Sequence, residues 1–216
     1  MAEEAQPFLD LAESVSDEEN IGGATFRTVV INGKSIALVT SGISTVNAAH
    51  AATVAITRYG TDIPVISAGS AGGLSADCRI GDVIISTDVI NLDADVRAFG
   101  YALGQVPRMP ETYVSDVALA DKLFAGDHGQ PVARGRIGSG EKFAVTDVAL
   151  KLRDDFPEVV AVDMESVAIA QVAYKYGNPC VAVRAISDIA APDGTEFLTH
   201  IDDAALRSAQ VTISAI

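Results

Sequence analysis

The chain has 216 residues, the size of one ordinary domain, so a single core with one site is expected. Apolar residues make up 49% and charged residues 20%, which excludes a disordered chain, and the 18 Gly and 8 Pro exclude a fibrous or low-complexity one. The net charge of −14 repels nucleic-acid backbones and anionic lipids, so it favours a small or neutral partner over nucleic acid or a membrane.

The cysteines and the chain ends bear on the compartment. Cys78 and Cys180 lie far apart and match no metal-ligand or redox spacing, which suits a reducing environment. No segment approaches the roughly 20 consecutive apolar residues of a membrane span, and the N-terminus is acidic where a secretory signal is basic. We therefore expect a cytoplasmic protein with one domain over residues 1–216. Its first strand and the end of its last helix look trimmed.

The first segments in chain order predict a helix, a hairpin and a second helix. Residues 2–15 have the pattern of a short helix. Two β-rich runs, 24–31 and 35–39, flank Asn32-Gly33, the dipeptide that best fits a two-residue hairpin turn. Residues 45–59 form an alanine-rich helix that ends at Gly60.

From residue 64 onward, apolar runs alternate with helical segments. The predicted strands cover 65–68, 82–90, 132–137, 159–162 and 181–186, and the predicted helices cover 115–125, 146–154, 164–176 and 203–215. Apolar runs without alternation indicate strands covered on both faces, which predicts a three-layer α/β sandwich around a central mixed sheet. Ligands in such folds bind beyond the carboxyl ends of strands, here 69–74, 138–143, 163–166 and 187–193.

Several apparent motifs lack a residue or a spacing that the motif requires. Residues 135–142 resemble a phosphate-binding loop, but Glu141 stands where the motif needs a lysine. Ser70 lacks the glycine that a nucleophile elbow places two residues earlier, because Ala68 is there. The three histidines share no metal-ligand spacing. A kinase, a serine hydrolase and a metalloenzyme are therefore set aside.

Three polar clusters stand at predicted strand ends. Ser67–Leu74 holds three glycines, so it fits either a tight turn or a loop whose bare N–H groups approach a ligand. Asp163–Ser166 places two carboxylates and a thioether where a strand becomes a helix, although an acidic helix N-terminus would look the same. Ser187-Asp188 ends another strand, where an Asx-type turn is the alternative. Three such clusters in one domain favour a functional site.

These clusters belong to a longer series of motifs, which occur in the order of a known family. The series comprises Thr40–Ser44, Ser67–Leu74, Gly81–Val83, Asp93–Tyr101, Gly104–Pro107, Val162–Ser166 and Val183–Asp188. With them the chain resembles, over most of its length, the 5′-methylthioadenosine/S-adenosylhomocysteine nucleosidases of the nucleoside phosphorylase superfamily. The resemblance implies a homodimer that hydrolyses the N-glycosidic bond between adenine and a 5′-thio-substituted ribose in methionine salvage. It implies no metal or other cofactor.

The resemblance also implies two catalytic carboxylates. Met1–Ala5 looks like the family's Met-Glu-Glu-Glu segment, which makes Glu4 the base that activates water. The family's first strand, which leads into that glutamate, is missing here. Asp188, with Ser187 beside it, matches the general acid at adenine N7. Because adenine is a poor anionic leaving group, this acid needs a buried place that favours its protonated form.

The remaining implied residues bind the substrate. Glu165 and Met164 match the residues that hold the ribose hydroxyls, and Phe143 matches the ring that stacks on adenine. Further implied contacts are Met1, Ser70, Ala71, Gly72, Ala144 and Asp163, the last standing where the family commonly has Glu. The implied 5′-thio pocket comprises Ile43, Phe99, Tyr101 and Pro107, in part from the neighbouring subunit. Phe197 is the candidate for the aromatic that caps the site.

Three alternatives stay open at this point. A phosphorylase of the same fold needs a cationic phosphate cradle, but the chain has no Gly-Asp-Pro-x-Arg loop, and neither Arg97 nor Arg184 has a paired arginine nearby. A hydrolase of futalosine-type adenine nucleosides would differ only in the part of the pocket that faces the 5′ substituent. A catalytically silent nucleoside-binding protein would result if Glu4 did not act.

Overall fold

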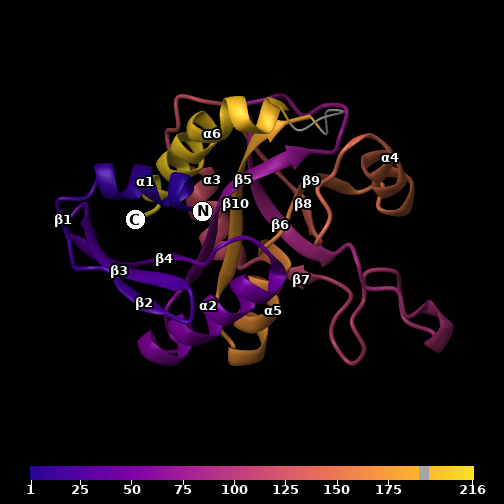
Figure 1. Ribbon diagram of the computed structural model, residues 1–216, viewed down its shortest axis with the longest axis horizontal. Helices are drawn as coiled ribbons and strands as arrows, with labels where there is room; N and C mark the ends of the chain where they lie inside the picture. Colours follow the sequence, from indigo (N-terminus) through magenta and orange to yellow (C-terminus); the bar gives the residue numbers. More distant parts are fainter. Residues whose placement is uncertain (190–194) are drawn as a thin grey trace.

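The structure is a computed structural model that describes residues 1–189 and 195–216. Its centre is one mixed sheet in the order β10-β5-β9-β8-β6-β7, which closes on itself because β10 also pairs with β6 (Figure 1). The strands are β5 (Val65–Gly73), β6 (Val83–Asn91), β7 (Tyr113–Val114), β8 (Val132–Ser139), β9 (Val159–Asp163) and β10 (Cys180–Asp188). The sheet combines parallel pairs, such as β10 with β5, and antiparallel ones, such as β10 with β6. The predicted central mixed sheet is confirmed.

Helices pack against both faces of this sheet. They are α3 (Val117–Phe124), α4 (Thr146–Asp155), α5 (Ser166–Tyr176) and α6 (Thr195–Ser214), whereas α2 (Thr45–Tyr59) packs against α5. Val183 of β10 packs in a cluster with α3 and α6, whereas its neighbour Ala182 packs in a cluster with α5. Successive residues of β10 are therefore buried on opposite faces, which explains why its sequence shows no polar alternation.

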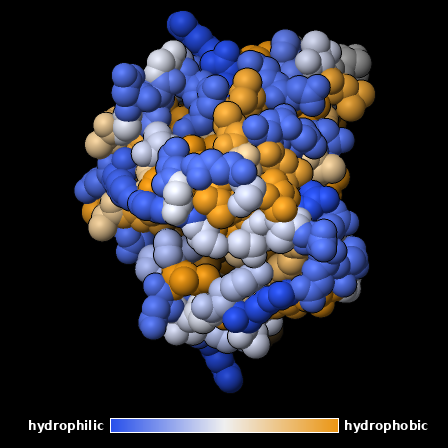
Figure 2. All heavy atoms as spheres, turned by 90° about the vertical axis from the view of Figure 1, so that its left-hand side faces the viewer, coloured by the Kyte–Doolittle hydropathy of each residue, from blue (hydrophilic) through white to orange (hydrophobic). Residues whose placement is uncertain are grey.

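The N-terminal part forms α1 (Ala2–Asp10) and a separate antiparallel sheet. The strands of this sheet are β1 (Ser14–Val15), β2 (Glu19–Ile21), β3 (Ala24–Ile31) and β4 (Lys34–Thr40). Asn32 and Gly33, with φ of 51° and 70°, form the predicted hairpin turn between β3 and β4. Figure 2 faces this end of the molecule and shows apolar residues gathered near its middle, within a largely polar surface.

Two predicted helices have different bounds in the structure. The first ends at Asp10 instead of residue 15, because Ser14 and Val15 pair with β3 as a short strand. The last begins at Thr195 instead of residue 203. Among the described residues, no helix combines the length and the apolar character that crossing a bilayer requires.

The prediction of a loop at Ser67–Leu74 is wrong, because β5 continues to Gly73. Its glycines are strand residues that pair with β10, as Gly69 does with Arg184, or with β9, as Gly73 does with Ala161. A Cβ atom at Gly69 would lie 2.5 Å from both Nη1 of Arg184 and Oε1 of Glu4. The glycine therefore serves the close approach of two charged side chains, and the chain does not turn there.

Candidate active site

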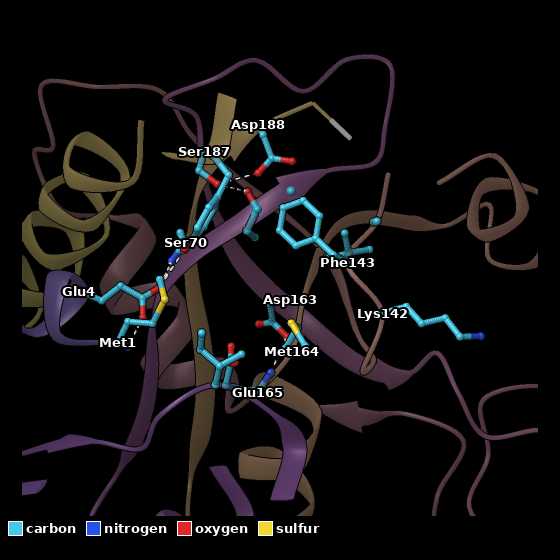
Figure 3. Close-up of a pocket in the computed structure, with 16 residues that line it drawn as sticks. Met1, Glu4, Ser70, Lys142, Phe143, Asp163, Met164, Glu165, Ser187 and Asp188 are labelled. Atoms are coloured by element: carbon cyan, nitrogen blue, oxygen red, sulfur yellow. Dashed lines mark hydrogen bonds and ion pairs between the residues drawn. The ribbon is translucent and has the colours of Figure 1, made fainter. Parts of the chain in front are cut away.

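A cavity of about 180 Å³ opens beyond the carboxyl ends of β5, β9 and β10, where the fold class places a ligand (Figure 3). Every predicted site residue lines this cavity except Phe99, Tyr101 and Pro107. The lining comprises Met1, Glu4, Ile43, Ser70, Ala71, Gly72, Lys142, Phe143, Ala144, Val162, Asp163, Met164, Glu165, Ser187, Asp188 and Phe197. Of the predicted segment 187–193, residues 190–193 lie outside the described residues.

Glu4 reaches the cavity from the first turn of α1. Its Oε1 atom accepts hydrogen bonds from the Ser70 backbone N–H at 2.8 Å and from Ser70 Oγ at 2.9 Å. Its Oε2 atom lies 2.5 Å from the N-terminal ammonium of Met1. Burial alone would raise the pKa of Glu4, but the ammonium, the Arg184 guanidinium and the Ser70 amide together lower it. The carboxylate is therefore ionised at neutral pH and able to accept a proton.

Asp188 ends β10 on the other side of the cavity, near Phe143 (Figure 3). It is only 3% exposed, and Ser187 beside it is fully buried. Ser187 Oγ donates a hydrogen bond of 2.8 Å to Asp188 Oδ1. A Cβ atom at Gly72 would lie 3.3 Å from Asp188 Oδ2, so the bare strand leaves room for this carboxyl group. Burial disfavours the charged form of a carboxyl group, and a general acid must hold its proton before the reaction.

Asp163 and Arg184 form a buried ion pair beneath the cavity. Arg184 Nε lies 2.7 Å from Asp163 Oδ2, and both side chains are almost completely inaccessible. Arg184 Nη2 also donates to Ser67 Oγ at 2.8 Å. Asp163 further accepts from Ser139 Oγ at 2.5 Å and from Ser166 Oγ. The sequence analysis named Asp163 as a site residue but did not predict its pair with Arg184, because the two residues lie on β9 and β10 with β5 between them.

Glu165 lies just before α5 and points to the same cavity. Its Oε1 atom accepts a hydrogen bond of 3.2 Å from the Ser44 backbone N–H, and its Oε2 atom lies 3.8 Å from Arg184 Nη2. Burial, followed by the negative charges of Asp163 and Glu4, raises the pKa of Glu165, although Arg184 and the Ser44 amide oppose the shift. A carboxylate held in this way accepts hydrogen bonds strongly from ligand hydroxyls.

Two phenylalanine side chains form an aromatic wall of the cavity. Phe143 and Phe197 meet edge to face, with ring centroids 5.8 Å apart and planes at 79°. Phe143 is 43% exposed, so part of its ring is free to cover a flat ligand. The Met164 side chain also lines the cavity, whereas the Lys142 ammonium group points away from it (Figure 3). The sequence analysis missed Lys142 and Val162 as lining residues.

The three predicted residues outside the cavity lie on the segment between β6 and β7. This segment carries a short 3₁₀ helix, η1 (Arg97–Phe99), and extends away from the sheet on the right of Figure 1. Phe99 is 82% exposed, and Pro107 is exposed as well. Within this chain, the Phe99 ring therefore lies in solvent and does not line the cavity.

Comparison with known proteins places this fold and cavity in a family. The family model described as the phosphorylase superfamily matches residues 1–216. A 5′-methylthioadenosine/S-adenosylhomocysteine nucleosidase from Actinobacillus succinogenes is 40% identical over 221 aligned residues, which cover 100% of this chain and 95% of that protein. The chain belongs to this nucleosidase family within the phosphorylase superfamily.

Solved structures of the nucleosidase family and of a futalosine hydrolase share this fold. The nucleosidase from Neisseria meningitidis, in complex with methylthio-immucillin-A, superimposes with a TM-score of 0.92 at 36% identity and covers 100% of this chain and 94% of its own. The futalosine hydrolase of Helicobacter pylori superimposes with a TM-score of 0.91 at 28% identity over 100% and 93%. The fold alone therefore does not separate these two substrate classes.

Proposed function

We propose that this chain is one hydrolase domain that releases adenine from 5′-methylthioadenosine and S-adenosylhomocysteine, as a step of methionine salvage. The observation that carries the proposal is the convergence of three carboxylates, Glu4, Glu165 and Asp188, on one cavity. Family membership supports the substrate class, because the nucleosidase relatives are named for these two nucleosides.

The proposed reaction begins with the leaving group. Asp188 transfers its proton to adenine N7 while the bond between ribose C1′ and adenine N9 breaks, so the electron pair leaves with a neutral base. Positive charge then develops on the sugar, where the ionised Glu165 accepts hydrogen bonds from the ribose hydroxyls. Glu4 takes a proton from a water molecule that attacks C1′. The products are adenine and the 5′-thioribose.

Water, not phosphate, is the proposed nucleophile. A phosphorylase needs cations that are free to hold phosphate, but the Arg184 guanidinium is buried and paired with Asp163. Arg97 lies on the exposed segment and pairs with Asp95. The N-terminal ammonium of Met1 is paired with Glu4, and the lysine of the lining, Lys142, directs its ammonium group away from the cavity (Figure 3). These positions favour hydrolysis over phosphorolysis.

A futalosine-type adenine nucleoside is the second candidate substrate, because the hydrolase from Helicobacter pylori shares the fold. The 5′ side of this cavity presents Ile43 and the Met1 side chain, which favour an apolar substituent.

We further propose that the functional unit is a cytoplasmic homodimer. Phe99, Tyr101 and Pro107 then reach the cavity of the partner subunit and complete its 5′-thio pocket. The 82% exposure of Phe99 supports this arrangement, because a phenylalanine ring is stabilised by burial. Ile43, which is 49% exposed at the rim of the cavity, offers the surface against which such a ring would pack.

The decisive experiment measures adenine release from 5′-methylthioadenosine by the wild type and by Asp188→Asn, with and without phosphate. We expect wild-type turnover that is independent of phosphate and a loss of about 10²–10⁴-fold in the variant. Turnover that requires phosphate would reassign the chain to the phosphorylases. An Asp188→Asn variant as fast as the wild type would remove Asp188 from the reaction.

A further inference from the structure

Ser44, the residue just before α2, has an unusual backbone conformation. Its φ of 103° and ψ of 146° lie in a region that glycine adopts freely and that other residues adopt only under strain. Strain of this kind persists only where surrounding contacts hold it, and it is concentrated at functional sites. The contacts of Ser44 therefore indicate what the strain maintains.

The group that holds Ser44 is the carboxylate of Glu141, which extends from the loop after β8. Glu141 Oε1 accepts hydrogen bonds from Ser44 Oγ at 3.1 Å, from the Thr45 backbone N–H at 2.8 Å and from Thr45 Oγ1. The Glu141 backbone N–H in turn donates to Asp93 Oδ2 at 2.7 Å, which fixes the loop. A negative charge at the N-terminus of a helix is also favoured by the helix dipole. These hydrogen bonds lower the pKa of Glu141, so the contact persists at neutral pH.

The strained conformation directs the Ser44 backbone N–H toward the active site. This N–H donates to Glu165 Oε1 at 3.2 Å, although Ser44 caps α2 and its side chain already accepts from the Val46 N–H. Glu165 is the carboxylate to which we assign the ribose hydroxyls. An unbroken chain of contacts thus runs from Glu141 through Ser44 to Glu165.

We propose that Glu141 is a positioning residue that holds Ser44 in its strained conformation, so that the Ser44 amide orients Glu165 toward the ribose. The proposal rests on the ribose-binding role of Glu165 in the proposed function. Glu141 also precedes Lys142-Phe143 in the chain, so the same carboxylate ties the loop that bears the adenine-facing ring to the start of α2. From the sequence alone, Glu141 had one use, which was to exclude the interpretation of residues 135–142 as a phosphate-binding loop.

The test is a double-mutant cycle of two substitutions, Glu141→Ala and Ser44→Gly. Glu141→Ala removes the acceptor, and Ser44→Gly removes the need for it, because glycine adopts this φ without strain. With 5′-methylthioadenosine we expect Glu141→Ala to raise KM about tenfold, as the loss of a charge-assisted hydrogen bond does. In the Ser44→Gly background the same substitution should raise KM by less than about threefold. Glu141→Gln, which keeps an acceptor oxygen, should stay within about threefold of the wild type.

The pH profile separates positioning from a general loss of structure. Glu165 faces Arg184 from β10, Asp163 from β9 and Glu4 from α1, and Glu141 is not one of these groups. The Ser44 amide is one of the groups that counteract burial, so its loss raises the pKa of Glu165 further. The acidic limb of kcat/KM should therefore move to higher pH in Glu141→Ala and return in the double variant. Asp147→Ala, which removes an exposed carboxylate of the same region, is the matched control and should leave KM and the limb unchanged.

Denaturant unfolding keeps this inference distinct from the proposed function. If the wild type releases no adenine, the proposed function fails. The coupling between Glu141 and Ser44 is then measured from the unfolding midpoints of the same variants. The inference predicts that Glu141→Ala lowers the midpoint more in the wild-type background than in the Ser44→Gly background, where only the hydrogen bonds to Thr45 are lost. Equal effects of Glu141→Ala in both backgrounds, on KM or on the midpoint, would overturn it. So would a Glu141→Ala variant with wild-type KM and pH profile.

Discussion

Arg184 Nε lies 2.7 Å from Oδ2 of Asp163, and the two side chains are 3% and 2% exposed. This pair places a guanidinium under the cavity floor, close enough to lower the pKa of Glu4 and to oppose the rise in the pKa of Glu165. One buried cation therefore helps to keep both substrate-facing carboxylates ionised, which is the state that a developing positive charge on the sugar requires.

Breaking this pair should be costly. Asp163→Asn leaves the Arg184 charge buried with weaker partners, and removing one member of a buried pair typically costs about 3–5 kcal/mol of unfolding free energy. The matched control is Asp155→Asn, which breaks the Lys151–Asp155 pair on the surface of α4, where the lysine side chain is 75% exposed. That pair should contribute less than about 1 kcal/mol. Urea unfolding of both variants measures the difference, and equal losses would contradict the buried pair's importance.

Glu165→Gln should make the protein more stable at neutral pH while impairing catalysis. The pKa of Glu165 is raised in the folded state, chiefly by burial, so the folded protein binds a proton more readily than the unfolded chain. The contribution of Glu165 to the unfolding free energy is therefore fully present below its unfolded pKa of about 4.5. It is lost as the pH rises through the pKa of Glu165 in the folded protein. A neutral glutamine avoids this loss. The stability gain of Glu165→Gln should thus grow from pH 4 to neutrality, as unfolding at several pH values would show. A gain that is constant with pH would contradict the prediction.

The sequence predicted which residues gather at the cavity better than it predicted the local structure that carries them. Apolar runs identified β6, β9 and β10, because these strands are buried along most of their length. β8 was also predicted, although only its second half is buried. The glycines of β5 misled the prediction, since they signal either a turn or close approach and only the positions of Glu4 and Arg184 decide between the two. The short strands β1 and β2 have exposed residues and no pattern of their own, so they form only through pairing with β3.

The site residues were named from motifs, but their coupling was not visible in the sequence. Asp188 and Glu165 could be singled out because each follows a buried strand. Glu141 and Ser44 lie 97 positions apart, and nothing local to either predicts their contact. A serine with φ of 103° also has no sequence signal, since glycine is the residue expected there.

The aromatic wall should contribute mainly to substrate binding. Phe143→Ala removes the ring assigned to adenine and should raise KM about tenfold, because an aromatic contact of this size is worth about 0.5–1.5 kcal/mol beyond the area it buries. Phe197→Ala should act through Phe143, whose ring it contacts at 5.8 Å, and so should matter little once Phe143 is gone. Leu150→Ala on α4, an apolar residue that is 55% exposed, is the control. Additive effects of the two phenylalanine substitutions would show that Phe197 binds the substrate independently.

Composite active sites in a homodimer make a quantitative prediction for mixed subunits. Phe99→Ala removes a residue proposed to serve the partner's cavity, whereas Asp188→Asn inactivates the cavity of its own subunit. In a mixed dimer, the cavity that keeps Asp188 receives an intact Phe99 from the other chain, so one site of the two is fully restored. Random exchange of equal amounts should therefore recover about a quarter of the wild-type kcat/KM, although each variant alone is impaired. Adenine release before and after subunit exchange measures this, with Leu150→Ala mixed with Asp188→Asn as the reference for simple dilution. If mixing Phe99→Ala with Asp188→Asn yields only the average of the two separate activities, Phe99 does not act across a dimer interface.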